Sequence, residues 1–152
     1  MKPAPPSLAA KLNLAPQSQI VVLNRPQELP VAQRLPGIEI SSACPRSGEI
    51  RQVLVFVTRL AEVERFAARV AERAAADAVV WFAYPKGGSK RYTCEFNRDS
   101  GWQALGEKGY EPVRMIAFDD DWSALRFRRA EFIRNMTRKR ALSAGGKARV
   151  QP

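Results

Sequence analysis

The feature that most constrains the fold is a strand, a helix and a second strand in succession between residues 52 and 83. Residues 53–57 are continuously apolar, as expected for a strand covered on both faces. Between residues 60 and 76 apolar side chains recur at helical spacing, which predicts an amphipathic helix with Thr58 as its N-cap. Residues 78–83 are apolar again after Asp77, which we expect to end the helix. Such a unit predicts a right-handed crossover between two parallel strands.

The remaining elements are weaker in the sequence. A short helical turn is predicted at residues 8–12, strands at 20–23 and 38–40, and a helix at 98–108 that Gly109 ends. Residues 113–118 and 122–127 flank three aspartates and are predicted to form an antiparallel hairpin. Pro30 and Pro36 are expected to prevent regular structure between them. We therefore predict an α/β fold: a three-layer, Rossmann-like and mostly parallel sheet that ends in an antiparallel hairpin.

The charge of the chain is concentrated at one end. The 152 residues carry a formal net charge of +10, and residues 126–152 hold nine Lys or Arg and one Glu, so +8 lies there and +2 elsewhere. We expect an extended arm at residues 1–17, a single α/β domain at 18–134 and a basic, disordered tail at 135–152. The tail predicts either weak nucleic-acid association or a solubilising extension. The residues for the first alternative are Arg134, Arg138, Lys139 and Arg140.

The composition excludes several kinds of site. There is no histidine, which removes the commonest general base and metal ligand and any Ser-His or Cys-His nucleophile. Cys44 and Cys94 lack the spacing of a zinc or redox motif and are interpreted as free, largely buried thiols of a cytoplasmic protein. No apolar run approaches the length of a signal peptide or a membrane span. We expect no metal, no membrane partner and a cytoplasmic location.

The candidate binding groups lie where the predicted parallel strands end. Ligands of open parallel sheets bind outside the carboxyl ends of the strands. There the loop 86–91 carries two glycines and three cations, which suits either an anion site or a flexible, solvated loop. The loop lacks the spacing of a P-loop. The candidate ligand-binding residues are Asn24, Thr58, Tyr84, Lys86, Ser89, Asp120 and Trp122.

The three aspartates at 119–121 allow more than one interpretation. They could hold Mg²⁺, but adjacent side chains cannot all point one way, and Asp is common in tight turns. A turn is therefore favoured, and one aspartate is also expected to pair with Lys86 or Arg126 across the edge. Trp122, Leu125 and Phe127 are favoured as packing residues of the hairpin over a ligand cage. Trp81, with Tyr84 and Tyr92 near the loop cations, resembles an aromatic patch for single-stranded nucleic acid, but its place in an apolar strand favours the core.

The order of these elements resembles the second half of the class I methyltransferase fold, whose last strand inserts antiparallel to the others. The motifs also resemble a family of small bacterial domains of unknown function, over about residues 8–130. That family usually has a small residue and an acid where this chain has Arg25 and Gln27. The resemblance implies a fold and no activity. Its motifs are Val22-Leu23-Asn24-Arg25-Pro26, Phe56-Val57-Thr58, Trp81-Phe82-Ala83-Tyr84-Pro85-Lys86 and Trp122-Ser123-Ala124-Leu125-Arg126-Phe127-Arg128.

The methyltransferase resemblance implies a glycine-rich turn after the first strand, which S-adenosylmethionine needs for close approach of the backbone. Here that turn is Asn24-Arg25-Pro26-Gln27, with no glycine before Gly37, so no cofactor is expected. The favoured hypothesis is a non-catalytic module of degenerate methyltransferase-like fold that binds a small ligand or a protein partner. One alternative is an enzyme acting on a small anionic substrate at the sheet edge, through Lys86 and an aspartate. The other is weak nucleic-acid association through the tail. The sequence leaves open whether the protein is an enzyme.

Overall fold

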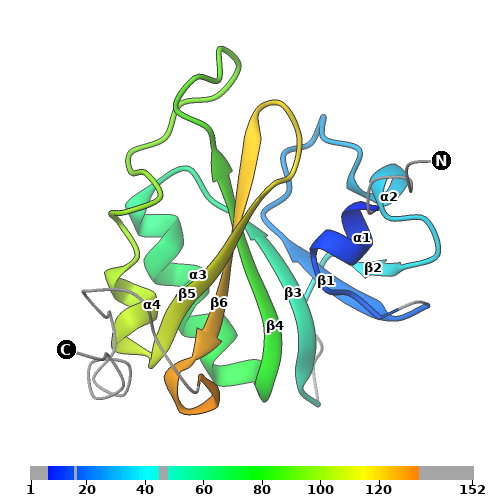
Figure 1. Ribbon diagram of the computed structural model, residues 1–152, viewed down its shortest axis with the longest axis vertical. Coiled ribbons are helices and arrows are strands. Elements are labelled where there is room, and N and C mark those ends of the chain that lie inside the picture. The colour runs from blue at the N-terminus through cyan, green and yellow to red at the C-terminus, as the bar shows by residue number, and fades with distance from the viewer. Residues whose placement is uncertain (1–6, 16, 45–47, 134–152) are drawn as a thin grey trace, which may run out of the picture.

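The protein is built on one six-stranded sheet, and the computed structural model describes residues 7–15, 17–44 and 48–133. The strands lie in the order β2-β1-β3-β4-β6-β5 (Figure 1). Their bounds are β1 Gln19–Leu23, β2 Glu39–Ser41, β3 Ile50–Phe56, β4 Ala74–Pro85, β5 Tyr110–Ala117 and β6 Trp122–Arg129.

The directions of the strands confirm the predicted fold class. β2, β1, β3 and β4 pair in parallel, whereas β6 pairs antiparallel with β4 on one side and with β5 on the other. In the register, Leu125 of β6 lies opposite Phe82 of β4 and Met115 of β5. β5 therefore runs in the direction of the first four strands, and β6 is the inserted antiparallel strand.

Helices cover the two faces unequally. The helices α3 (Leu60–Arg73) and α4 (Gln103–Glu107) pack on one face, where Phe66, Val70 and Leu105 join the first core cluster with strand residues such as Phe82. The short helices α1 (Leu8–Lys11) and α2 (Val31–Arg34) bury Leu8 and Val31 in a second cluster on the other face, which their C-cap residues Leu12 and Leu35 join. Figure 1 shows α1 and α2 beside β1 and β2, while no described helix lies over the β5–β6 part of that face.

The junction of α3 and β4 differs from the prediction. The helix ends at Arg73 rather than at residue 76, and β4 begins at Ala74, which pairs with Ile50 of β3. Asp77 therefore lies within β4 and does not end the helix. Alanine accepts both conformations, so the ladder with β3 decides where the strand begins.

Two further segments differ from the prediction. The helix expected at 98–108 is only α4, because residues 97–101 form a turn in which Asn97 Oδ1 accepts from the Asp99 amide at 2.8 Å. Gly109 follows α4 with φ +89°, the predicted left-handed residue after the C-cap. The segment between Pro30 and Pro36 is not irregular, since α2 forms one turn there and buries Val31 and Leu35.

The structure describes part of the predicted N-terminal arm. Leu8, Leu12 and Leu14 of the arm are buried in the second cluster. The limit at residue 17 and the single domain over 18–134 stay predictions. The tail at 135–152 and the four cations assigned to nucleic acid, Arg134, Arg138, Lys139 and Arg140, lie outside the described residues.

Candidate functional site

The carboxyl ends of β1, β3 and β4 meet at one edge of the sheet, as predicted, but the candidate residues there form two separate groups. Asn24 and Thr58 belong to a cluster around Glu62. Tyr84, Lys86 and Ser89 belong to a cavity at the end of β4. Asp120 is exposed and Trp122 is buried.

The first group, the Glu62 cluster, consists of Asn24, Thr58, Arg59 and Glu62. The side-chain amide of Asn24 donates to the Phe56 carbonyl at 2.8 Å and to Glu62 Oε2 at 2.5 Å. Glu62 Oε1 accepts from the backbone amides of Thr58 at 2.9 Å and Arg59 at 3.1 Å, and from the Thr58 hydroxyl. The cluster thus joins the ends of β1 and β3 to the start of α3.

Thr58 is not the N-cap of α3, as the sequence predicted; Arg59 occupies that position. The amides at the start of the helix find carboxylates instead, because Glu62 accepts from Arg59 and Glu95 Oε2 accepts from the Leu60 amide at 2.9 Å. Burial would raise the pKa of Glu62, but its bonds from Thr58, Asn24 and Arg59 together lower that pKa below its ordinary value. This half of the edge is therefore filled by the chain's own side chains.

The turn after β1 does not fit S-adenosylmethionine. Pro26 has no backbone N–H, and the Asn24 side chain is held by Phe56 and Glu62. The Arg25 guanidinium folds back onto the loop, donating to the carbonyl oxygens of Pro26, Gln27 and Leu29 at 2.9–3.0 Å. The loop therefore satisfies its own polar groups where the methyltransferase fold places backbone donors for a ligand.

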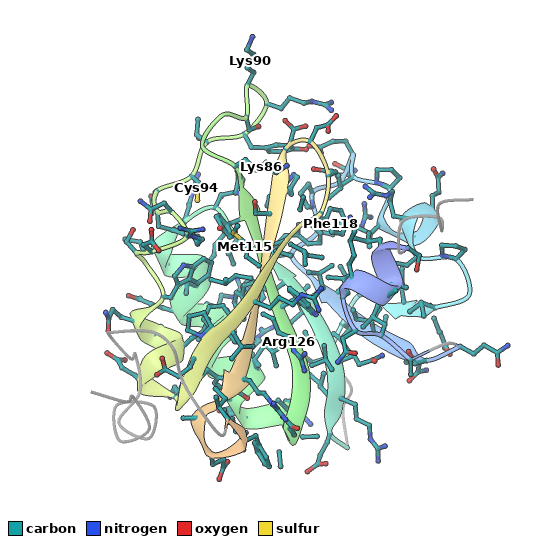
Figure 2. The ribbon with its side chains drawn as sticks, viewed as in Figure 1. Lys86, Lys90, Cys94, Met115, Phe118 and Arg126 are labelled. Carbon is teal, nitrogen blue, oxygen red and sulfur yellow. The ribbon has the colours of Figure 1, made fainter. Side chains whose placement is uncertain are left out.

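The second group lies around a cavity of about 550 Å³, which we call the β4 pocket. Figure 2 shows Lys86, Cys94 and Met115 around the end of β4, whereas Lys90 extends from the tip of the loop away from them. The pocket is framed by β4, the loop that follows it and the β5–β6 hairpin. Its lining residues are Tyr84, Pro85, Lys86, Gly87, Ser89, Tyr92, Thr93, Cys94, Phe96, Asn97, Arg98, Met115 and Ser123.

The polar lining of the β4 pocket favours an anion. It contains two cations, Lys86 and Arg98, and no carboxylate among the described lining residues. Arg98 lies 3.6 Å from the exposed Asp99, whereas the Lys86 ammonium group makes no hydrogen bond or ion pair within the described part of the chain. An anion entering the pocket would meet a cation that the chain itself leaves uncompensated.

The apolar wall of the pocket carries two protonated groups. The Tyr84 hydroxyl donates to Met115 Sδ at 3.3 Å, and burial raises the pKa of Tyr84. Burial likewise raises the pKa of the Cys94 thiol. Both groups therefore stay neutral at pH 7, where the phenol is a hydrogen-bond donor and the thiol is a poor nucleophile.

Sequence reasoning did not single out Arg98, Phe96 or Ser123 as pocket residues. Ser123 could have been found from the hairpin register, because it lies directly opposite Tyr84. Phe96 and Arg98 follow from no sequence pattern, since their place depends on how the loop after β4 folds back over the first core cluster.

The three aspartates form a turn, as favoured over a metal site. Asp119 Oδ1 accepts from the amides of Asp121 and Trp122, each at 2.8 Å. Asp121 holds the loop after β4, because its Oδ1 accepts from the Ser89 hydroxyl at 2.9 Å and its carbonyl from the Lys86 amide at 2.8 Å. The expected side-chain pairing with Lys86 or Arg126 is thus replaced by Ser89. No group of three potential metal ligands occurs among the described residues.

The tryptophans are packing residues. Trp81 is fully buried and its Nε1 donates to the Leu12 carbonyl at 2.8 Å. Trp122 is 1% exposed and packs against Phe56 and Tyr92 at centroid distances of 5.1 and 4.9 Å. Trp122 packs beneath the aspartate turn, in the second core cluster, and does not line the β4 pocket. Its neighbour Ser123 does line that pocket.

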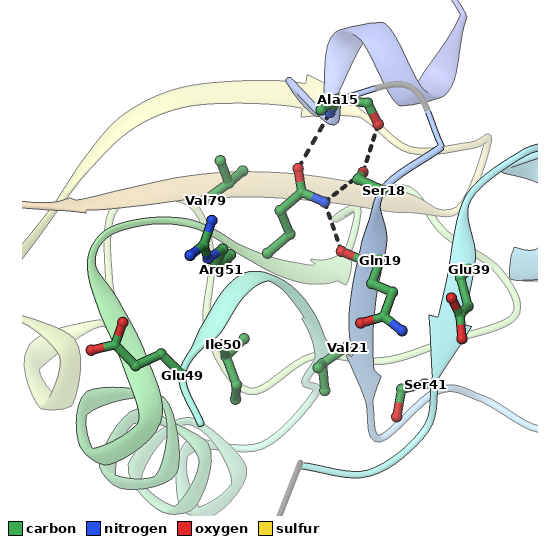
Figure 3. Close-up of a pocket in the computed structure, with 11 residues that line it drawn as sticks. Ala15, Ser18, Gln19, Val21, Glu39, Ser41, Glu49, Ile50, Arg51 and Val79 are labelled. Atoms are coloured by element: carbon green, nitrogen blue, oxygen red, sulfur yellow. Dashed lines mark hydrogen bonds between the residues drawn. The ribbon is translucent and has the colours of Figure 1, made fainter. Parts of the chain in front are cut away.

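A larger cavity, of about 800 Å³, lies at the opposite edge of the sheet. Figure 3 shows it among Ser18, Gln19, Glu39, Glu49 and Arg51, near the amino ends of β1 and β3. Its lining holds two carboxylates, from Glu39 and Glu49, and one cation, Arg51. The Gln52 amide in it is already bonded to Ala15, Ser18 and Gln19. We place the candidate site at the β4 pocket, whose described lining holds cations without a carboxylate and where the strands' carboxyl ends converge.

The comparisons with known proteins add little to this geometry. No protein-family model and no curated protein matches the chain. Among solved structures it is similar to the N-methyltransferase NodS from Bradyrhizobium japonicum WM9, with 11% identity, 74% of this chain and 85% of that chain covered, and a TM-score of 0.44. A likeness this low carries no argument, and the fold stands on its strand order and register. No helix in the described ranges is long and apolar enough to cross a membrane.

Proposed function

We propose that the protein is a non-catalytic module that binds a small anionic ligand in the β4 pocket. The observation that carries the proposal is Lys86, whose ammonium group makes no hydrogen bond or ion pair within the described part of the chain. Lys86 lines a cavity of about 550 Å³ beside Arg98 and without a described carboxylate in the lining. Tyr84, Phe96 and Met115 add an apolar wall, so the best ligand combines a carboxylate or phosphate with an apolar body.

Binding is favoured over catalysis by the protonation of the neighbouring groups. An enzyme at this edge needs a nucleophile or base poised near neutral pH. The raised pKa values of Tyr84 and Cys94 move both groups away from that role. Asp119 and Asp121 are committed to the turn, through the Asp119 bonds and the Asp121–Ser89 bond, and the exposed Asp120 does not line the pocket.

The test is a thermal-shift screen of the full chain against nucleotides, sugar phosphates and aromatic or aliphatic carboxylates. A ligand at one hundred times its dissociation constant stabilises by about 2.7 kcal/mol, which raises the melting temperature of a domain this size by several degrees. Lys86→Gln should remove the shift, whereas Lys90→Gln, at the tip of the same loop, should retain it.

Three outcomes contradict the proposal. The first is a screen in which no anion shifts the wild-type protein at millimolar concentration. The second is a ligand that shifts Lys86→Gln as much as wild type. The third is chemical conversion of a bound ligand, followed by mass spectrometry over hours, which would make the module an enzyme.

A further inference from the structure

Four arginines gather on the sheet face opposite α3, where no described helix covers β5 and β6. Arg126 of β6 and Arg114 of β5 are direct cross-strand partners, and Arg128 follows on the same face of β6. Arg34 of α2 joins them at the other end, with its guanidinium 5.3 Å from the centre of the Phe118 ring. We call Arg34, Arg114, Arg126 and Arg128 the arginine face; Arg126 and Phe118 are labelled in Figure 2.

The charges on this face are only partly compensated. The Arg128 guanidinium donates two hydrogen bonds to the Asp77 carboxylate, each 2.8 Å long, and these bonds fix this arginine in place. Glu111, opposite Arg128, is fully buried and engaged within the chain. Among the described contacts, only Arg128 has a carboxylate partner, whereas Arg34, Arg114 and Arg126 make no ion pair.

Arg126 is the unusual residue of the group. Its Nε is buried and has no hydrogen-bond partner in the described structure. Burial and the nearby charge of Arg128 lower the pKa of Arg126, and Arg114 adds to this although Asp77 opposes it. Like charges directly opposite one another destabilise an antiparallel pair, so the chain holds two cations together without an internal benefit. A bound anion would supply the acceptors that the guanidinium groups lack.

The shape of the face and the sequence that follows point to an extended anion. Directly paired residues lie about 5 Å apart and alternate residues of a strand roughly 6.6 Å apart, which spreads the cations in a row along the sheet. The chain continues from Arg128 through the 3₁₀ turn Ala130–Phe132, and residues 134–152 add six Lys or Arg and no acid. A row of cations continued by a basic sequence suits a polymer of phosphates better than one small phosphate.

We propose that the arginine face binds the phosphate backbone of single-stranded nucleic acid, without sequence preference. Arg114 and Arg126 each contact a phosphate, while Arg128 is held by Asp77 and positions the row. This surface lies on the other side of the sheet from the β4 pocket and does not depend on the function proposed there. It also differs from the tail, because its contacts are made by strands of the folded domain.

The test compares two doubly substituted full-length chains of equal charge. Arg114→Gln with Arg126→Gln changes the arginine face. Arg51→Gln with Arg69→Gln removes two exposed arginines elsewhere and is the control. Binding of a fluorescent oligothymidylate and of a duplex of equal length is measured by anisotropy at several salt concentrations. Thermal unfolding of each variant confirms folding; Arg114→Gln alone, at an exposed position, serves if the double variant does not fold.

The expected result is about a tenfold loss of affinity for the single strand in the Arg114/Arg126 variant and little change in the control. The slope of log K against log salt should also become less steep by about 1.4, since each single-strand phosphate contact contributes about 0.7. Equal losses in both double variants would overturn the proposal, as would tighter binding of the duplex. So would loss of all binding in an Arg138/Lys139/Arg140→Gln chain, or displacement by inorganic phosphate at low millimolar concentration.

Discussion

The Glu62 cluster and the β4 pocket occupy the same edge of one sheet, yet they treat polar groups in opposite ways. In the Glu62 cluster the Asn24 side-chain amide, the Thr58 hydroxyl and the backbone amides of Thr58 and Arg59 find acceptors in the chain, and the Asn24 amide joins β1 to β3 and α3. Lys86 lines the β4 pocket, and its ammonium group has no partner among the described residues. The strand order therefore indicates the edge at which a ligand would bind. Which half of that edge can accept a ligand depends on whether its polar groups, such as the Lys86 ammonium group, still lack partners in the chain.

The largest expected effect comes from a substitution that disturbs the wall of the β4 pocket. Gly101 has φ +91°, and a Cβ there would lie 2.5 Å from the Cβ of Phe96, which lines the β4 pocket. Gly101→Ala should lower the free energy of unfolding by about 3 kcal/mol through strain and overlap, measured by denaturant titration. Gly109→Ala has a similar φ of +89° but no neighbour within 4 Å, so its loss should be about 1 kcal/mol. Equal losses would show that the wall tolerates movement of Phe96.

The second prediction concerns a substitution that disrupts the Glu62 cluster. Glu62→Ala removes the acceptor of the Thr58 and Arg59 amides and of the Asn24 side chain, and should cost about 2 kcal/mol of unfolding free energy. Glu64→Ala, exposed on the same helix, should change stability by less than about 0.5 kcal/mol. A Glu62 variant as stable as the Glu64 variant would contradict the view that this half is held by the carboxylate.

The same pair of variants carries a pH signature. The folded-state pKa of Glu62 is lowered, so its stabilisation is present above its ordinary value of 4.5 and is lost as pH falls through the folded value. The wild-type protein should therefore lose stability below pH 4.5 more steeply than Glu62→Ala does. Glu64→Ala should follow the wild-type curve in that range.

The smallest expected effect concerns the loop 86–91, which borders the β4 pocket. Asp121→Ala removes the acceptor of the Ser89 hydroxyl and should cost about 1 kcal/mol. The loop 86–91 should then open more often, which limited trypsin digestion detects at Lys86, Lys90 and Arg91. Asp120→Ala is the control, because that side chain is exposed and only Asp121 holds Ser89. Equal cleavage rates in the two variants would mean that the loop is fixed by other contacts.

The sheet was predictable because its strands carry local signals. Residues 53–57 and 78–83 are apolar on both sides of an amphipathic helix, and the aspartate turn separates the two strands of the hairpin. The end of α3 was not predictable, because Ala74–Ala76 fit a helix or a strand and the ladder with β3 decides. The turn at α2 was missed for a related reason: Pro30 precedes a helical turn without cost to its hydrogen bonding.

The candidate site was predictable in position and not in detail. Tyr84, Lys86 and Ser89 follow directly from the end of a strand, and all three line the pocket. Asn24 and Thr58 were placed at the right edge, but their role depends on Glu62, the third residue of α3, whose Oε2 comes within 2.5 Å of the Asn24 amide only after folding. The arginine face escaped prediction because the pairing of Arg114 with Arg126 depends on an irregularity in the β5 register near Pro112.

The insertion of β6 between β4 and β5 also sets an order of assembly during synthesis. β4 and β5 are complete in the nascent chain before their common neighbour exists, since β6 ends at Arg129. Until then β4 has one unpaired edge beside apolar residues such as Val80 and Phe82, and β5 has no strand to join. Such an edge is prone to pair with another chain. A ribosome that stops before Trp122 would therefore release a chain whose β5 is intact in sequence but absent from the sheet.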